Sequence, residues 1–240
     1  RQHGKGMIIL ETALETAGLT YVFPDGNGIK NIAFQVKRGE IYALYGGHHA
    51  GKSVLLQTII GTLRSQAGTL KLFGNIDYQK ERRRIGFVPQ KPVTIGSLSP
   101  ADMLRYFSSV FGTTEIHILD ILHLNLKEKK AVRRLPLSTQ RLVNLAVALL
   151  GNPDMIILDD PFSALDRRTE DAVFKNLREY ARDRIVLLIS HRLYHFPEMD
   201  QIVFLENGAA VTGTHQQLCD TVPAYRSLYE SQTGGTSHEV

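Results

Sequence analysis

The sequence has one cysteine, Cys219, and no tryptophan. A single cysteine cannot form an intramolecular disulfide, which excludes the disulfide-stapled secreted domains and fits a reducing compartment. We interpret this cysteine as structural. Long apolar runs are also missing, because the longest ones, Leu142–Leu150 and Ile185–Ile189, fall short of the roughly 20 residues that a membrane-spanning helix needs. A role at a membrane would therefore depend on a partner.

The sequence also lacks a strong excess of either sign of charge. Lysine and arginine total 28 against 24 aspartates and glutamates, a net charge of +4, and only Arg82–Arg84 form a basic run. Such a balance selects no class of partner, and nucleic acid is not expected. Apolar residues make up 43% and charged residues 22% of the 240, the proportions of a soluble protein with a packed core. The length suits one large domain or a core with an inserted lobe.

The two ends of the chain differ in character from the rest. Residues 1–7 are polar and basic with no apolar signal region after them, which indicates a flexible leader or an expression remnant. The small and polar residues 233–240 indicate a flexible tail. The folded domain is therefore expected within residues 8–232.

Strand and helix patterns follow one another near the N-terminus. Apolar residues alternate or cluster over 29–45, with a turn at Lys37–Glu40, which predicts two strands. The second strand, Ile41–Tyr45, runs into a glycine pair, and Ser53–Leu63 then shows the apolar spacing of a helix with one buried face.

A βαβ unit is predicted further along. Met155–Leu158 and Ile185–Ile189 are almost entirely apolar, as strands buried on both faces of a parallel sheet are, and Thr169–Arg182 between them has a helical pattern. Within Gln201–Val211, two apolar segments flank Asn207–Gly208, a strong hairpin signal. Residues 92–150, which precede this βαβ unit, show helical spacing and no strand pattern. This predicts a helical lobe inserted into an α/β core.

A glycine-rich motif lies between the predicted strand at Ile41–Tyr45 and the helix that follows. Its residues match the pattern G-x-x-x-x-G-K-[ST]: Gly46, Gly47, His48, His49, Ala50, Gly51, Lys52 and Ser53. In that setting the glycines let backbone N–H groups point at phosphates, aided by the positive end of the helix dipole. Lys52 is then expected to reach the β- and γ-phosphates, and the Ser53 hydroxyl to ligate Mg²⁺.

The motif allows other interpretations. It could be a glycine-rich turn followed by a surface lysine, although the flanking strand and helix argue against that. His48 and His49 could form a metal site, but inside a loop wrapped around phosphate we interpret them as passive members whose bulk can alter the fit.

Two adjacent carboxylates, Asp159 and Asp160, end the predicted strand that begins at Met155. Beside a phosphate loop, Asp159 is expected to hold Mg²⁺ through water and Asp160 to polarise the attacking water as a general base. Taken alone, the pair could equally be a solvated turn before Pro161. The phosphate loop favours the functional interpretation.

Over residues 19–232 the sequence resembles the ATP-binding cassette (ABC) ATPases, whose landmarks occur here in the family's order. Ile85–Gln90 resembles the Q-loop strand, which implies that Gln90 reaches the metal and senses the γ-phosphate. Leu188–His191 resembles the switch-histidine strand, which implies that His191 contacts the γ-phosphate. Phe23 stands where the family usually keeps a ring that stacks on adenine. A common form of the D-loop is matched by Ser163, Ala164, Leu165 and Asp166.

The resemblance implies an α/β fold: a P-loop NTPase core of the ABC ATPase type with an antiparallel β subdomain and a helical subdomain at about 92–150. It implies ATP and Mg²⁺ as cofactors, a second ABC ATPase subunit and transmembrane permease domains as partners, and a position on the cytoplasmic face of a membrane. The short lobe and the segment 213–229 resemble those of ABC exporters, which favours export over uptake.

The family's signature segment, typically Leu-Ser-Gly-Gly-Gln, is altered. It closes over the nucleotide of the opposite subunit in the family's dimers. Counting back without gaps from Asn152–Pro153 assigns it here to Leu135, Pro136, Leu137, Ser138 and Thr139, whereas a one-residue slip would make Leu137–Ser138 the Leu-Ser pair. Pro136 lacks an N–H and Leu137 adds bulk where donors to the partner's γ-phosphate are usual.

Asp160 is a second departure, because the family generally has glutamate there. The shorter carboxylate retreats from the water it must orient, and small misplacements can reduce rates about 100-fold. The two departures weaken different sites of a dimer, so we expect a degenerate member of an asymmetric heterodimer. Alternatives are a regulatory nucleotide sensor that does not hydrolyse ATP, or a soluble ABC protein of translation or DNA repair.

Overall fold

The computed structural model describes residues 11–76, 78–113, 122 and 124–233. The predicted leader, residues 1–7, and residues 234–240 of the predicted tail lie outside the described residues. Thr233, predicted to begin the tail, instead ends the last helix, α8 (Pro223–Thr233). None of the described helices is long and apolar enough to cross a membrane.

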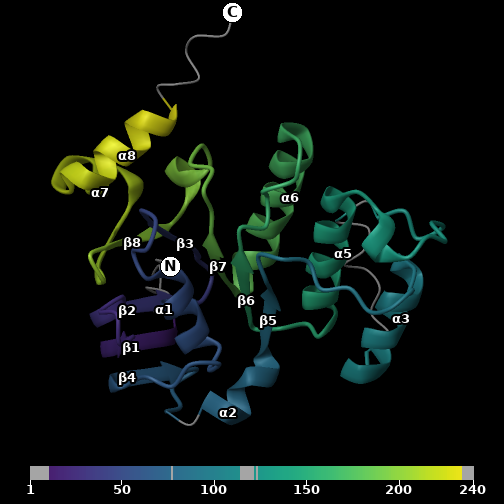
Figure 1. Cartoon of the computed structure of the whole chain (residues 1–240), viewed down its shortest axis with the longest axis horizontal. Helices are drawn as coiled ribbons and strands as arrows, with labels where there is room; N and C mark the ends of the chain where they lie inside the picture. The colour runs from purple at the N-terminus through teal and green to yellow at the C-terminus, as the bar shows by residue number, and fades with distance from the viewer. Residues whose placement is uncertain (1–10, 77, 114–121, 123, 234–240) are drawn as a thin grey trace, which may run out of the picture.

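A six-stranded sheet forms the centre of the molecule, in the order β5-β6-β7-β3-β8-β9 (Figure 1). Its strands are β3 (Ile41–Gly46), β5 (Ile85–Val88), β6 (Met155–Asp159), β7 (Ile185–Ile189), β8 (Gln201–Glu206) and β9 (Ala209–Gly213). Strands from β5 to β8 pair in parallel, and only β9 is antiparallel to its neighbour. The loops after β3, β5, β6 and β7 therefore meet at one edge, where α/β sheets bind ligands.

A three-stranded antiparallel sheet lies beside the central one, in the order β2-β1-β4. It consists of β1 (Thr12–Val22), β2 (Gly28–Lys37) and β4 (Ala67–Leu72). Leu55 and Ile59 of helix α1 (Lys52–Ile59) pack in one apolar core with Ile32 of β2 and Leu187 of β7. Helix α1 thus joins the two sheets.

Helices cover the opposite face of the central sheet. Their shared core contains Leu149, Phe174 and the fully buried Tyr225, together with Val186 and Leu188 of β7. The helices are α5 (Leu137–Leu150), α6 (Arg167–Tyr180), α7 (His215–Thr221) and α8. Since Ile185, Leu187 and Ile189 belong to the other core, β7 is buried on both faces, as its all-apolar sequence predicts.

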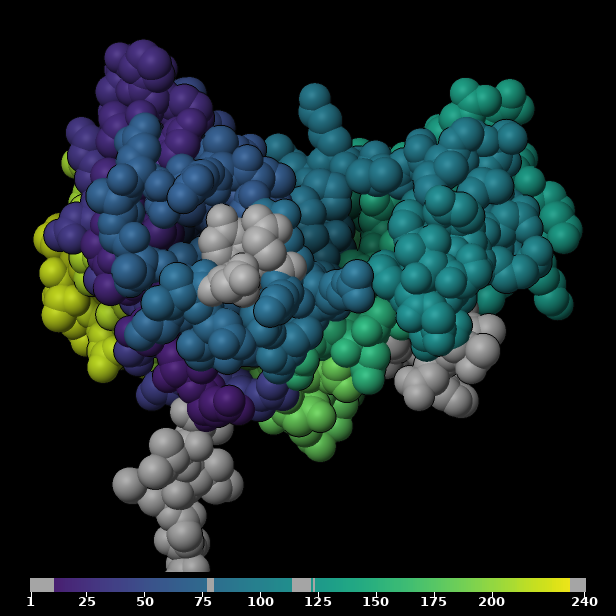
Figure 2. Space-filling view, turned by 90° about the horizontal axis from the view of Figure 1, so that it is seen from below, coloured from purple at the N-terminus to yellow at the C-terminus, as the bar shows by residue number. Residues whose placement is uncertain are grey.

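A helical lobe projects beyond β5 and is teal in Figures 1 and 2. Its main helices are α3 (Pro100–Phe111) and α5, which pack against each other through Met103 and Val143. Ser99 begins α3 as an N-cap whose hydroxyl accepts from the Asp102 N–H. A short helix α2 (Tyr78–Glu81) and single turns at Arg82–Arg84, Val132–Arg134, Ala181–Asp183 and Phe196–Glu198 complete the described helical elements.

The α/β fold class is confirmed, and the structure corrects several details. The two strands predicted over 29–45 are β2 and β3, but they belong to different sheets. The helix predicted to end at Leu63 ends at Ile59, because Gly61 turns the chain with a positive φ of 77°. The predicted hairpin is β8–β9, with positive φ at both Asn207 and Gly208. Strands β1 and β4 were not individually predicted.

The helix predicted over Thr169–Arg182 is α6, and it is displaced toward the N-terminus. It begins at Arg167 because the Asp166 carboxylate caps it by accepting from the Thr169 N–H at 3.0 Å. It ends at Tyr180, after which the chain makes a single tighter turn.

Gly86 in β5 sets how closely the lobe approaches the sheet. A Cβ at this position would lie 2.5 Å from the Ala148 carbonyl oxygen of α5. We expect G86A to lower the free energy of unfolding by about 1–3 kcal/mol, because α5 must move outward, and the melting temperature to fall accordingly. G151A is the control, because its Cβ would meet only Phe111 at 3.6 Å. Equal melting temperatures for the two variants would contradict this packing.

Candidate functional site

The glycine-rich loop joins β3 to α1 at the carboxyl edge of the central sheet. A Cβ on Gly46 would lie 2.3 Å from the Leu205 carbonyl oxygen, and one on Gly51 would lie 2.6 Å from the Gly28 carbonyl oxygen. Gly51 also has a left-handed backbone with φ of 96° just before α1. Both glycines are therefore required by close backbone contacts, and the loop is held between β8 and β2.

Lys52 folds back into this loop. Its Nζ donates hydrogen bonds to the carbonyl oxygens of Gly46 at 2.6 Å and Gly47 at 2.8 Å. An ammonium group has three donors, so one remains for a phosphate oxygen. Burial lowers the pKa of Lys52, and the Asp159 carboxylate acts in the opposite direction. The ammonium is thus partly desolvated inside the loop, where its attraction to an anion is strengthened.

The loop borders a cavity of about 460 Å³ that gathers residues from separate parts of the chain. Most of the predicted nucleotide-binding residues line it: Phe23, His48, His49, Ala50, Gly51, Lys52, Ser53, Gln90 and His191. Gln90 follows β5 and His191 follows β7, so the sheet order brings both to the loop after β3. Phe23 rests edge-on against Tyr21, with ring centroids 5.0 Å apart, and is exposed.

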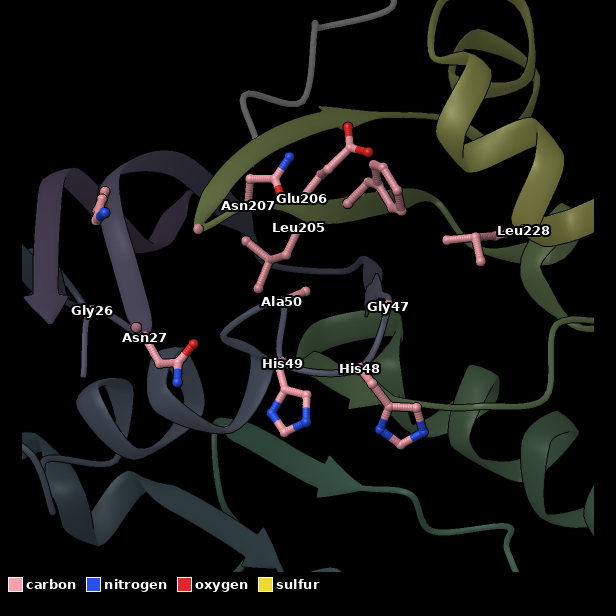
Figure 3. A pocket seen from close by; sticks show the side chains of 14 residues that line it. Gly26, Asn27, Gly47, His48, His49, Ala50, Leu205, Glu206, Asn207 and Leu228 are labelled. Atoms are coloured by element: carbon pink, nitrogen blue, oxygen red, sulfur yellow. The ribbon is translucent and has the colours of Figure 1, made fainter. Parts of the chain in front are cut away.

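A second cavity, of about 510 Å³, shares His48 and His49 with the first. Figure 3 shows the two imidazoles extending from the loop, away from Glu206 and Asn207. The ring of His48 also lies nearly parallel to that of His191, with centroids 6.3 Å apart and an angle of 21°. The histidine pair therefore faces both cavities.

Asp159 is the last residue of β6, two strands away from β3 in the sheet, and Asp160 follows it. Asp159 and Ser53 line one cavity next to the phosphate loop. Burial and the adjacent Asp160 raise the pKa of Asp159, whereas His191, Arg141 and Lys52 lower it. Asp160 is buried, has a left-handed φ of 51°, and donates its N–H to the Ile189 carbonyl oxygen at 2.8 Å.

The Ser53 hydroxyl and the Asp159 carboxylate fit Mg²⁺. This ion prefers oxygen ligands and commonly takes one or two carboxylates, with phosphate and water completing its shell. No cluster of three or more His, Cys, Asp or Glu side chains suited to a metal occurs among the described residues.

The altered segment at residues 135–139 lies at the start of α5. Pro136 is the N-cap residue, and no side chain caps the helix. Leu135 is buried, whereas Leu137 is an exposed apolar side chain on the first turn. The gapless assignment thus puts the segment at a helix N-terminus, with a proline and a leucine where small or polar residues are the family's rule.

The predicted D-loop begins three residues after Asp160. Ser163 accepts a hydrogen bond at its Oγ from Arg141 at 3.0 Å, and the Leu165 carbonyl oxygen accepts from Arg192 at 3.0 Å. Ala164 between them is partly exposed. Two arginines from different elements therefore hold this loop.

Sequence reasoning missed Arg141 and Asn144, two buried polar residues on α5. Asn144 accepts from the Val93 N–H at 2.8 Å and donates to the Val93 carbonyl oxygen at 2.9 Å. The available signal was weak: an arginine and an asparagine in an otherwise apolar helix that the spacing placed in the lobe core.

The raised pKa of Asp159 means that ionising it costs folding stability. The cost is fully present above the folded pKa, diminishes as pH falls below it, and is gone below the ordinary pKa of 3.8, where the carboxyl is neutral in both the folded and the unfolded protein. We expect D159N to melt at a higher temperature than the wild type at pH 8, and the difference to vanish below pH 3.8. Thermal unfolding followed by circular dichroism measures this. A lower melting temperature for D159N at pH 8 would contradict the assignment.

The chain was compared with known proteins. The family model for "ABC transporter" matches residues 29–163. An uncharacterized ABC transporter ATP-binding protein, YxlF of Bacillus subtilis, is 31% identical over 75% of this chain and 63% of its own length. A "probable multidrug resistance ABC transporter ATP-binding/permease protein", YheI of Bacillus subtilis, is 27% identical over 92% of this chain and 40% of its own length.

Among solved structures, a bacterial Atm1-family ABC exporter with ATP bound matches 97% of this chain with a TM-score of 0.82 at 21% identity. At this low identity the match shows the fold alone, and it covers 43% of that exporter chain. This chain spans less than two thirds of the length of the two Bacillus proteins. The family model covers more than half of the chain and includes the phosphate loop and the acid pair. The chain therefore belongs to the ABC transporter family, as an ATP-binding domain.

Proposed function

We propose that this chain binds ATP with Mg²⁺ and acts as the motor subunit of an ABC transporter, with export as the direction of transport. The observation that carries the proposal is the single cavity in which Lys52, Ser53, Gln90 and His191 meet beside the phosphate loop. Export is favoured because the YheI relative is named for multidrug resistance and the matching solved structure is an exporter.

Each side chain has a definite task in this proposal. The loop N–H groups and Lys52 bind the phosphates, and the Phe23 ring stacks on the adenine. Ser53, Asp159 and Gln90 hold Mg²⁺, which when bound neutralises phosphate charge. Asp160 takes the proton of the attacking water, and His191 contacts the terminal phosphate.

The partners are a second ABC ATPase subunit and transmembrane permease domains, with the chain on the cytoplasmic face of the membrane. A heterodimer is favoured because Asp160 weakens the site on this chain's own loop, whereas Pro136 and Leu137 weaken the site on the partner's loop. If the second subunit had the usual family residues at both positions, each of the two nucleotide sites would contain only one altered feature.

A regulatory nucleotide sensor is the second candidate. The observations that favour it are the proline N-cap and the exposed Leu137 at the start of α5, since both remove donors from the second subunit's nucleotide. A sensor would bind nucleotide and change partner without turning ATP over.

Nucleotide binding is tested with a fluorescent ATP analogue and Mg²⁺. We expect K52A to raise the dissociation constant at least about tenfold, because it removes the charge that binds the phosphates. K175A is the matched control, because Lys175 is an exposed lysine on α6, remote in sequence from the loop. Equal affinities for K52A and the wild type would sink the proposal.

Turnover separates the motor from the sensor. In the motor, D160E should raise ATP turnover about tenfold in the presence of the membrane partner, because the longer carboxylate reaches the water better. D160N should abolish turnover and retain binding. Phosphate release assays on the chain alone and with its partner measure both. Wild type, D160E and D160N all binding ATP with no turnover would favour the sensor instead.

A further inference from the structure

Arg141 lies buried where the helical lobe meets the catalytic loops. Its exposed fraction is 5%, although it sits on α5, the lobe helix that begins with the altered segment. One terminal nitrogen donates to the Pro89 carbonyl oxygen and the other to Ser163 Oγ, both at 3.0 Å. Its side chain therefore joins three segments: α5, the residue before Gln90, and the predicted D-loop.

Asn144 strengthens the first of these connections. It is three residues after Arg141, on the same side of α5, and is also buried. Its two hydrogen bonds to the Val93 backbone hold the chain just after Gln90. Gln90 thus lies between two points, Pro89 and Val93, that are both attached to α5.

The second connection leads to Asp160. The Ser163 N–H donates to the Asp160 carbonyl oxygen at 3.4 Å, and the Asp160 N–H donates to Ile189 of β7. The backbone of Asp160 is therefore hydrogen-bonded both to β7 and to Ser163, whose hydroxyl accepts from Arg141. A shift of α5 would reach Asp160 through a single side-chain hydrogen bond.

A buried arginine is costly for a role in packing alone. Removing a guanidinium from water carries a penalty that an apolar side chain would not have. Burial lowers the pKa of Arg141, and the charges of Asp160 and Asp159 act in the opposite direction. Its Nε has no hydrogen-bond partner among the described residues. What arginine alone supplies is a planar fork that can reach acceptors on two separate loops at once.

We propose that Arg141 is a positioning residue that couples the helical lobe to the general base: through Ser163 it sets the position of Asp160, and through Pro89 it ties the same helix to Gln90. The inference rests on the proposed function, because it assigns Arg141 a part in ATP hydrolysis. The lobe and the acid would then move together when nucleotide binds.

Hydrogen exchange tests the link in the nucleotide-free protein. In R141Q and in S163A, the amides of Ser163 and Leu165 should exchange about tenfold faster than in the wild type, the effect of losing one charge-assisted hydrogen bond. The amides of α1 should not change. R141K, which keeps one donor group and the charge, should fall between. R105Q is the control, because Arg105 is an exposed lobe arginine paired with Asp102.

Unchanged exchange at Ser163 and Leu165 in R141Q would overturn the proposal. So would faster exchange spread evenly over the whole chain, since that would show a structural role only. S163A covers the case in which R141Q does not fold, because it removes the same hydrogen bond and leaves the buried arginine in place.

Kinetics then separate positioning from binding. With Mg-ATP and the membrane partner, R141Q and S163A should each lower kcat about tenfold and change KM less than about twofold. The R141Q/S163A double variant should be no slower than R141Q alone, because R141Q already removes the hydrogen bond to Ser163. Additive losses would overturn the proposal. A wild type that binds no nucleotide would contradict the proposed function. In that case hydrogen exchange at Ser163 and Leu165 would still test whether Arg141 holds the loop that follows Asp160.

Discussion

The site depends on two places where the backbone of the phosphate loop touches its neighbours with no room for a side chain. Gly46 lies against the carbonyl oxygen of Leu205 in β8, and Gly51 against that of Gly28 in β2. These contacts fix the loop between the central sheet and the antiparallel sheet. They also set the starting point and direction of α1, and hence the path by which Lys52 returns to the Gly46 and Gly47 carbonyl oxygens.

Around that loop, charges are held at some cost to stability. Burial shifts the pKa of Lys52 downward and that of Asp159 upward, so the charged form of each group is less stable here than in water. Each of the two partly offsets the shift of the other. A site of this kind trades stability for affinity, because a phosphate and a divalent cation would satisfy the charges that the protein leaves partly unsatisfied.

The departures from the family pattern lie on two segments that a hydrogen bond of Arg141 connects. Pro136 and Leu137 are at the start of α5, and Arg141 is one turn further along the same helix. Asp160 lies on the loop that Arg141 reaches through Ser163. The proposed link thus connects the two unusual features, and it would let the lobe affect hydrolysis even though the signature donors are altered.

Local patterns determined much of this protein from sequence alone. The phosphate loop, the acids after Met155–Leu158 and the hairpin at Asn207–Gly208 were predictable, because a strand period, a glycine turn or a capping position involves neighbours in the chain. The glycine-rich motif between a strand and a helix also indicated the α/β fold class. Resemblance then supplied candidate roles for Gln90 and His191, which no local pattern could provide.

Only the tertiary structure decided which separate segments meet. The strand order places Gln90, Asp159 and His191 along one edge with Lys52, and it puts β1 and β4 in a different sheet from β3. Arg141 is an unexpected charged residue in an apolar helix. In the folded chain it connects Pro89 and Ser163, which are 52 and 22 residues away from it in sequence. Such pairings follow from packing over long sequence separations, and neither periodicity nor residue type at one position encodes them.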